Sequence, residues 1–131
     1  MTKLRTILLI DDDIAVNYIH KYVIKKADVV DQVITMMNGQ MAIDYLINDD
    51  SAESTVPELI FLDINMPGMD GWGFLDGYKK QQEKDKTKII MLTTSDNESD
   101  KERAMATGQV LEFITKPLTK QGLLDVIGRY F

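Results

Sequence analysis

Short apolar runs that alternate with longer amphipathic segments constrain the fold of this chain more than any other feature. Five such runs are rich in aliphatic or β-branched residues: TILLI (6–10), QVITM (32–36), LIFL (59–62), KIIML (88–92) and EFIT (112–115). TILLI, LIFL and KIIML are apolar continuously rather than at alternate positions, which is typical of strands buried on both faces. The pattern therefore predicts a sheet that is covered on both sides.

The segments between these runs have helical spacing. Each is expected to bury the apolar residues of one side: Val16, Ile19 and Val23 in residues 14–27; Ala42, Ile43, Leu46 and Ile47 in residues 39–48; Phe74, Leu75 and Tyr78 in residues 72–84; and Leu123, Leu124, Val126, Ile127 and Tyr130 in the last segment. With a further helix in between, five strands alternate with five helices. Such an order predicts an α/β fold with a parallel sheet, right-handed crossovers and helices on both faces.

Capping residues predict where two of these helices begin. Residues 95–108 (SDNESDKERAMATG) hold two overlapping capping-box patterns, which start at Ser95 and at Ser99, so the sequence leaves two possible starts one turn apart. Gly108 is expected to end this helix. Thr119 is a predicted N-cap for the last helix.

Length and composition limit the classes of protein to which the chain can belong. Its 131 residues suit a single domain, and 44% hydrophobic with 27% charged residues is ordinary globular usage. A net charge of −6 argues against direct nucleic-acid binding, and the lack of cysteine excludes disulfides and thiolate chemistry. The apolar run near the N-terminus is too short for a signal peptide or a membrane span. We expect a cytoplasmic protein that forms one domain over residues 1–131, with no output domain and no membrane insertion.

Side chains capable of chemistry follow four of the predicted strands. They are Asp11, Asp12 and Asp13 after the first run, Asp63 after the third, Thr93, Thr94 and Ser95 after the fourth, and Lys116 with Pro117 after the fifth. Ligands of an open parallel sheet bind beyond the carboxyl ends of its strands, so these residues are expected to meet at one edge. Singly, each has an ordinary explanation as a helix cap, a turn residue or a surface charge. His20, in the middle of a predicted helix, is interpreted as a packing or surface residue rather than a ligand.

The aspartates taken together indicate a hard divalent cation. Carboxylates within about 4–6 Å of one another raise each other's pKa unless a cation compensates their charge. Oxygen ligands without a neighbouring thiolate or histidine favour Mg²⁺, which keeps waters and would leave one carboxylate free to attack phosphorus. A lysine and a hydroxyl at the same point would neutralise and hydrogen-bond the transferred phosphoryl oxygens. Two other sites do not fit, because a Walker A loop is absent and an EF-hand begun at Asp63 would place Phe74 where it needs glutamate.

Four motifs carry a resemblance that spans almost the whole chain: LLIDDD (8–13), LIFLDINMPGMDGWGFL (59–75), IIMLTTS (89–95) and FITKP (113–117). In this order and spacing they resemble the receiver (CheY-like) domain of two-component response regulators, of the stand-alone single-domain type. The resemblance implies a flavodoxin-like, doubly wound, five-stranded parallel sheet of order 2-1-3-4-5 with five helices.

The resemblance also implies a role for single residues. The implied roles are the phosphoacceptor, Asp63; its catalytic partners, Lys116 and Thr93; the ligands of Mg²⁺ or Mn²⁺, Asp11, Asp12, Asp63 and the backbone carbonyl of Asn65; the switch pair, Thr93 and Phe113; and residues that tune the lifetime of the acyl phosphate, Asn65, Thr94 and Ser95. The Lys116–Pro117 bond is expected to be cis. Asp13, where the first helix begins, is expected to be an N-cap without a catalytic role.

One spacing departs from that of typical receiver domains. From Gly108 to Lys116 the chain is one residue longer, which moves a counted alignment of the switch hydroxyl to Thr94. The strand context LTTS favours Thr93, with Thr94 at the small-residue position that controls access to the site. We interpret the offset as an extra loop residue in GQVLEF (108–113).

The function implied by the resemblance is a phosphorylation-dependent signalling switch, not an enzyme with a separate substrate. A sensor histidine kinase or a histidine phosphotransfer protein would supply the phosphoryl group to Asp63. The surface of the fourth helix, fifth strand and fifth helix would then change, to regulate an unidentified partner protein or to pass the phosphate on.

Two alternatives account for parts of the sequence. A haloacid dehalogenase-type phosphatase would use Asp11 as nucleophile and Asp13 as acid/base, but its D-x-D-x-T motif is broken by Ala15, and residues 63–67 would have no role. A degenerate receiver that only binds proteins would lack part of the motif set, and here the set is complete. A phosphoryl label on Asp63 instead of Asp11 would exclude the phosphatase. Uptake of beryllofluoride with Mg²⁺ would exclude the degenerate receiver.

Overall fold

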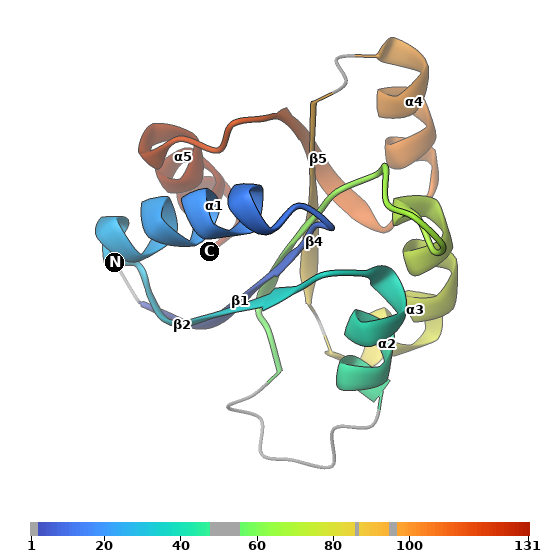
Figure 1. Ribbon diagram of the computed structural model, residues 1–131, viewed down its shortest axis with the longest axis horizontal. Helices are drawn as coiled ribbons and strands as arrows, with labels where there is room; N and C mark the ends of the chain where they lie inside the picture. The colour runs from blue at the N-terminus through green and yellow to red at the C-terminus, as the bar shows by residue number, and fades with distance from the viewer. Residues whose placement is uncertain (1–2, 48–55, 86, 95–96) are drawn as a thin grey trace.

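Five parallel strands form one sheet of order β2-β1-β3-β4-β5 in the computed structural model, which describes residues 3–47, 56–85, 87–94 and 97–131 (Figure 1). The strands are β1 (Leu4–Ile10), β2 (Val30–Met36), β3 (Leu59–Leu62), β4 (Lys88–Thr93) and β5 (Val110–Thr115). The helices are α1 (Ile14–Ala27), α2 (Gly39–Ile47), α3 (Gly71–Asp85), α4 (Glu98–Ala106) and α5 (Lys120–Tyr130). The predicted fold, with its five strands and five helices, is confirmed.

The strand order brings distant parts of the sequence to one edge of the sheet. Ile10, the last residue of β1, pairs with Met36 of β2 on one side and with Leu62 of β3 on the other. At the same edge, Thr93 of β4 pairs with Thr115 of β5. Because all strands are parallel, the residues that follow them gather beyond this edge.

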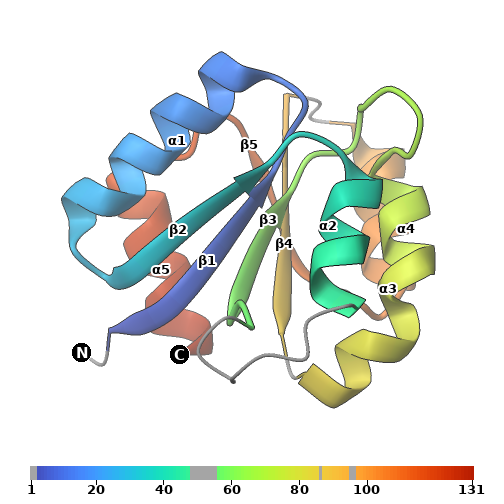
Figure 2. The same cartoon turned by 60° about the horizontal axis from the view of Figure 1, so that its bottom comes forward.

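Two layers of helices cover the sheet (Figure 2). Helices α1 and α5 lie over one face, and α2, α3 and α4 lie over the other (Figure 1). The sheet's side chains are shared between the two cores: Leu8 and Ile60 face the α2–α4 side, and Ile7 and Phe61 face the α1–α5 side. This two-sided burial is why the central strands are continuously apolar. None of the helices in the described part of the chain is long and apolar enough to cross a membrane.

The predicted inner face of α1 is wrong. Its buried side chains are Asn17, His20 and Ile24, whereas Ile19 is 53% exposed and the two predicted valines are only half-buried. Asn17 donates a hydrogen bond to the backbone carbonyl of Asp11, and His20 accepts one from the backbone N–H of Leu118, which accounts for the burial of these two polar side chains. In α2, Ile47 was also expected inside, but it is the last residue of the helix and is 45% exposed. The predicted inner residues of α3 and α5 pack against the sheet as expected.

Helix α4 begins between the two predicted starts. Its N-cap is Asn97, whose Oδ1 accepts hydrogen bonds from two backbone N–H groups of the first turn, at 2.8 and 3.3 Å. Ser99 therefore lies inside the helix, and Ser95 lies outside the described residues. Asparagine caps a helix as well as serine does, and the capping-box pattern did not consider it. Two other predictions are confirmed: Gly108 follows α4 in the left-handed conformation (φ +73°), and Thr119 caps α5.

The pairing of β4 with β5 is irregular within residues 108–113, the segment in which an extra residue is predicted. Two consecutive residues of β4, Ile89 and Ile90, pair with Val110 and Glu112 of β5. Leu111 between them has no pairing partner and forms a β-bulge. A bulge takes up an inserted residue within the strand by placing two residues opposite one. The register beyond it is regular up to the loop that carries the lysine.

Candidate functional site

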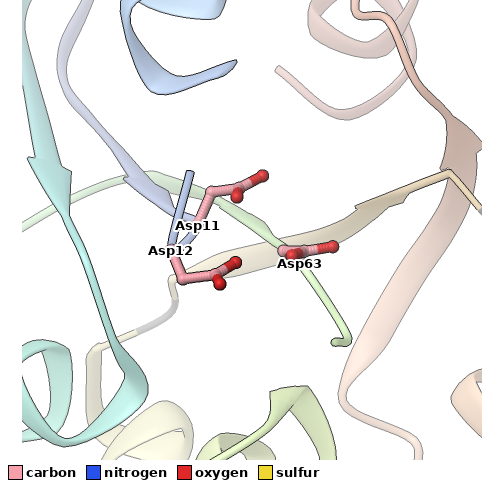
Figure 3. A group of neighbouring side chains, drawn as sticks. All are labelled: Asp11, Asp12 and Asp63. Carbon is pink, nitrogen blue, oxygen red and sulfur yellow. The ribbon is translucent and has the colours of Figure 1, made fainter. Parts of the chain in front are cut away.

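Three carboxylates meet at the carboxyl edge of the sheet. Asp11 and Asp12 directly follow β1, and Asp63 directly follows β3, the strand beside it. The backbone N–H of Asp63 donates to the carbonyl oxygen of Ile10 at 2.9 Å, which continues the pairing of β1 with β3 by one residue beyond the end of β3. One oxygen of each carboxylate lies within 4.8 Å of the others, and Figure 3 shows the three side chains directed to a common space. Asp11 and Asp63 are buried and Asp12 is exposed, so the group opens to solvent on one side.

The third aspartate of the DDD run has a different role. Asp13 caps α1: its Oδ1 accepts hydrogen bonds from the backbone N–H groups of Ala15 (2.9 Å) and Val16 (3.2 Å). Its own backbone N–H donates to Oδ1 of Asp11 at 3.0 Å. The prediction that Asp13 is an N-cap is confirmed, and its carboxylate is engaged at the helix terminus.

Lys116 reaches the carboxylates from the loop that follows β5. Its Nζ lies 2.5 Å from Oδ2 of Asp11 and 3.3 Å from Oδ1 of Asp63, and all three side chains are at least 89% buried. The backbone N–H of Lys116 donates to the carbonyl oxygen of Thr93 at 2.7 Å, which ties this loop to the end of β4. The Lys116–Pro117 bond is cis, as predicted.

Burial and neighbouring charges shift two of these groups. Burial, reinforced by the charge of Asp11, raises the pKa of Asp63 despite the opposing effect of Lys116. Burial lowers the pKa of Lys116, but its hydrogen bond to Asp11 and the charge of Asp63 outweigh this, so the pKa lies above its ordinary value. Lys116 is therefore a cation at neutral pH.

The charges of the site suit a divalent cation. Three carboxyl groups outnumber the single ammonium of Lys116, so the group is rich in acidic oxygens that one divalent cation can compensate. The donors are all oxygens, which a hard cation prefers, and the exposed side leaves room for the waters that Mg²⁺ retains. Asp11, Asp12 and Asp63 are therefore the residues of this site that fit a metal ion.

The remaining predicted residues lie around this group. Thr93 is fully buried at the end of β4, and Phe113 is half-buried on β5, packed against the core on the α2–α4 side. Asn65 is exposed on the loop after β3. Thr94 is exposed and lines a groove beside Lys116. Ser95, the remaining predicted residue, lies outside the described part of the chain.

Two polar residues of α1 join the site without having been predicted in it. Asn17 donates from Nδ2 to the backbone carbonyl of Asp11 at 2.9 Å, and Nε2 of His20 accepts from the backbone N–H of Leu118 at 3.2 Å. His20 was expected to pack or to lie at the surface, and it packs. The available signal was the spacing of Asn17 and His20, which places both on one side of the helix.

Comparison with known proteins identifies the family. The sequence pattern of the response regulator receiver domain matches residues 7–128. The chain belongs to the response regulator receiver domain family. It is 32% identical to the heme response regulator HssR of Staphylococcus haemolyticus and 36% identical to the nitrate/nitrite response regulator protein NarL of Escherichia coli K12, over 89% and 93% of this chain. These alignments cover 47% and 52% of the two relatives, so the chain spans about half their length.

A solved receiver structure agrees with this assignment. A two-component response regulator from Cytophaga hutchinsonii superposes with a TM-score of 0.88 at 32% identity, over 97% of this chain and 96% of that one. Receiver domains are signalling proteins of two-component systems, and they typically bind Mg²⁺ in an acidic pocket such as that of Asp11, Asp12 and Asp63. Membership of the family sets the haloacid dehalogenase-type alternative aside, and Asp13, its required acid/base, caps a helix.

Proposed function

We propose that this receiver domain accepts a phosphoryl group from a phosphohistidine onto Asp63 and thereby changes the surface formed by α4, β5 and α5. The donor is a sensor histidine kinase or a histidine phosphotransfer protein, and the changed surface regulates a partner protein or passes the phosphate on. The observation that supports this proposal is Lys116, whose ammonium lies within 3.3 Å of both a predicted metal ligand, Asp11, and the predicted phosphoacceptor.

The chemistry follows from the charges at this edge. An oxygen of Asp63 attacks phosphorus, the P–N bond to the donor histidine breaks, and its electron pair stays on the imidazole nitrogen. Lys116 neutralises a phosphoryl oxygen as the new P–O bond forms. Asp11, Asp12, Asp63 and the carbonyl of Asn65 would hold Mg²⁺ or Mn²⁺, which would supply further positive charge for the phosphoryl oxygens when bound. The domain acts only on itself, through its own phosphorylation and dephosphorylation.

Thr93 and Phe113 are the proposed switch. Phosphorylation adds about −1.5 to −2 charges and strong acceptor oxygens beside the end of β4. A hydrogen bond from the Thr93 hydroxyl to such a group is worth about 1.5–3 kcal/mol, which lies within the ~1–3 kcal/mol of ordinary allosteric couplings. The space vacated by Thr93 would admit the ring of Phe113 and alter the α4–β5–α5 surface. Asn65, Thr94 and Ser95, close to the site in sequence or space, are the proposed tuners of the phosphoryl lifetime.

Mass spectrometry after treatment with acetyl phosphate and Mg²⁺ tests the acceptor. We expect one phosphoryl group on the peptide that contains Asp63, sensitive to base, and none on Asp63→Asn. A label on Asp11, or no label on the wild type, would refute the proposed chemistry.

The switch is tested separately by NMR. Beryllofluoride with Mg²⁺ should shift resonances of α4, β5 and α5 in the wild type. Thr93→Ala should still bind beryllofluoride but should lose most of these remote shifts. Remote shifts that persist in Thr93→Ala would remove this hydroxyl from the switch.

A further inference from the structure

The buried side of α1 is polar next to the site. Asn17 and His20 are 4% and 3% exposed, whereas Ile14, Tyr18 and Tyr22 of the same helix are 58–72% exposed. Burying polar groups is unfavourable unless they form hydrogen bonds. A helix that turns large apolar side chains outward and buries asparagine and histidine is therefore held in place by what those two side chains bind.

Asn17 holds the chain that carries Asp11. Its Nδ2 donates to the backbone carbonyl oxygen of Asp11 at 2.9 Å, at the point where β1 ends and the metal-site aspartates begin. The backbone N–H of Asp11 still bonds to the carbonyl of Met36 in β2. The peptide unit after Asp11 is thus fixed by α1 instead of by a strand.

His20 holds the loop that carries Lys116. Its Nε2 accepts from the backbone N–H of Leu118 at 3.2 Å, so Nε2 carries no proton and the ring is neutral. Burial, together with the charge of Lys116, lowers the pKa of His20 against the opposing effect of Asp11. Since the backbone N–H of Lys116 bonds to Thr93, the loop is held on both sides of the lysine side chain.

The two hydrogen bonds hold opposite ends of the same ion pair. Asn17 acts on the segment of Asp11 and His20 on the loop of Lys116, whose side chains meet at 2.5 Å. Both α1 residues also border the small cavity beneath Asp11 and Asp63. We propose that Asn17 and His20 are positioning residues for phosphoryl transfer, by which α1 sets where the Asp11 carboxylate and the Lys116 ammonium stand relative to Asp63. This inference rests on the proposed function.

The two residues should affect different steps. Because Asn17 acts through a metal-site aspartate, Asn17→Leu should weaken Mg²⁺ binding, by about 10-fold as is usual for a group that orients a metal ligand. Because His20 acts through the lysine, His20→Leu should leave the affinity for Mg²⁺ close to that of the wild type. It should lower the rate of phosphorylation by acetyl phosphate at saturating Mg²⁺, again by about 10-fold.

Conservative variants separate positioning from packing. In His20→Gln the amide oxygen can reach the place of Nε2 and accept from Leu118, so this variant should recover most of the rate. His20→Asn is equally polar but too short, and it should remain slow. Ile24→Val, fully buried one turn further along α1, is the matched control: it loses core packing without losing a hydrogen bond and should phosphorylate like the wild type.

The measurements are Mg²⁺ titration, the rate of phosphorylation at saturating Mg²⁺, and thermal unfolding of each variant. Equal rates for His20→Gln and His20→Asn, a rate for Ile24→Val as low as theirs, or an unchanged Mg²⁺ affinity in Asn17→Leu would overturn the inference. The glutamine and asparagine pair keeps the comparison valid if the leucine variant does not fold. Failure of the proposed function has a different signature, since the wild type itself would then acquire no label on Asp63.

Discussion

Replacing Lys116 with methionine should make the stability of this domain depend strongly on Mg²⁺. Methionine keeps much of the apolar stem but removes the ammonium that lies 2.5 Å from Asp11 and 3.3 Å from Asp63. In the metal-free protein the two buried carboxylates would then repel each other without a cation between them. Bound Mg²⁺ would supply the missing positive charge, so most of the lost stability should return when it is added.

The expected loss follows from the two distances. At an effective dielectric constant of about 20, unit charges attract by about 7 kcal/mol at 2.5 Å and about 5 kcal/mol at 3.3 Å. Desolvation of the ammonium offsets much of this attraction, and removing one partner of a buried pair costs about 3–5 kcal/mol net. The site is open on the side of Asp12, so we expect the lower end of that range, about 3 kcal/mol.

Urea unfolding with EDTA and with saturating Mg²⁺ measures this effect. With a urea dependence of about 1–3 kcal/mol per molar, a loss of about 3 kcal/mol lowers the midpoint in EDTA by about 1–3 M. In Mg²⁺ the difference from the wild type should be much smaller. By linkage, the variant should also bind Mg²⁺ more tightly than the wild type, because metal binding stabilises it more.

The matched control is Arg129→Met. Arg129 of α5 forms an exposed ion pair with Glu112 of β5, and the substitution removes its cation. Glu112 pairs with Ile90, three residues before the end of β4, and neither partner of this ion pair belongs to the carboxylate group. The small loss of stability in this variant should therefore be the same in EDTA and in Mg²⁺. If Lys116→Met were destabilised equally under both conditions, the lysine would act through the packing of its stem, and the charge argument would be refuted.

Three further predictions concern neighbouring residues. Asp63 has a raised pKa in the folded state, so its contribution to stability is full at low pH and is lost as pH rises through that pKa. Asp63→Asn should therefore be more stable than the wild type near neutral pH in EDTA, with a gain that disappears toward the ordinary aspartate pKa of about 3.9, as followed by thermal unfolding against pH. Asp13→Ala should lose about 1 kcal/mol through its lost N-cap, while isothermal titration shows an unchanged Mg²⁺ affinity; a weakened affinity would make Asp13 part of the metal site. Gly71→Ala would place its Cβ 2.7 Å from the carbonyl oxygen of Asp63 and 2.9 Å from Cα of Ile64. Since these are backbone atoms, the loop must shift to admit the Cβ. The free energy of unfolding in urea should therefore fall by about 1–3 kcal/mol, and phosphorylation should be slower. Wild-type values for both would show that the loop adjusts without cost.

The sequence predicts the location of the site because topology alone determines it. Continuous apolar runs identify strands buried on both faces, and parallel strands present the residues that follow them at one edge. Asp11 and Asp63, 52 positions apart in the sequence, are adjacent because β1 and β3 are neighbours in the sheet. The Asp13 cap was predictable for another local reason, since a short acceptor directly before an amphipathic segment bonds to the first free N–H groups.

Features set by tertiary contacts could not be predicted in this way. A spacing argument detects one extra residue before Lys116 but cannot distinguish a longer loop from a bulge, because both restore the same position downstream. The structure has a bulge at Leu111 of β5, which can accommodate one extra residue within the strand. Nor does the sequence indicate that Lys116 lies closer to Asp11 than to Asp63. That difference in distance depends on the relative positions of the ends of β1 and β3 and of the loop that carries the lysine.

The wrong prediction for the buried side of α1 has a cause in the position of this helix beside the edge where the carboxylates gather. Hydrophobic periodicity predicts a buried face on the assumption that a helix packs only against apolar side chains. In its first half α1 instead packs against the loop segments that follow β1 and β5. There the backbone carbonyl of Asp11 and the backbone N–H of Leu118 need hydrogen-bond partners. Asn17 and His20 provide them, and only further along, at Ile24, does the buried side become aliphatic again. The polar part of the buried side is thus the part of the helix that borders the carboxylate group. In a fold of this kind, polar residues at one end of an otherwise apolar buried helix side indicate that this end packs against loop backbone instead of strands.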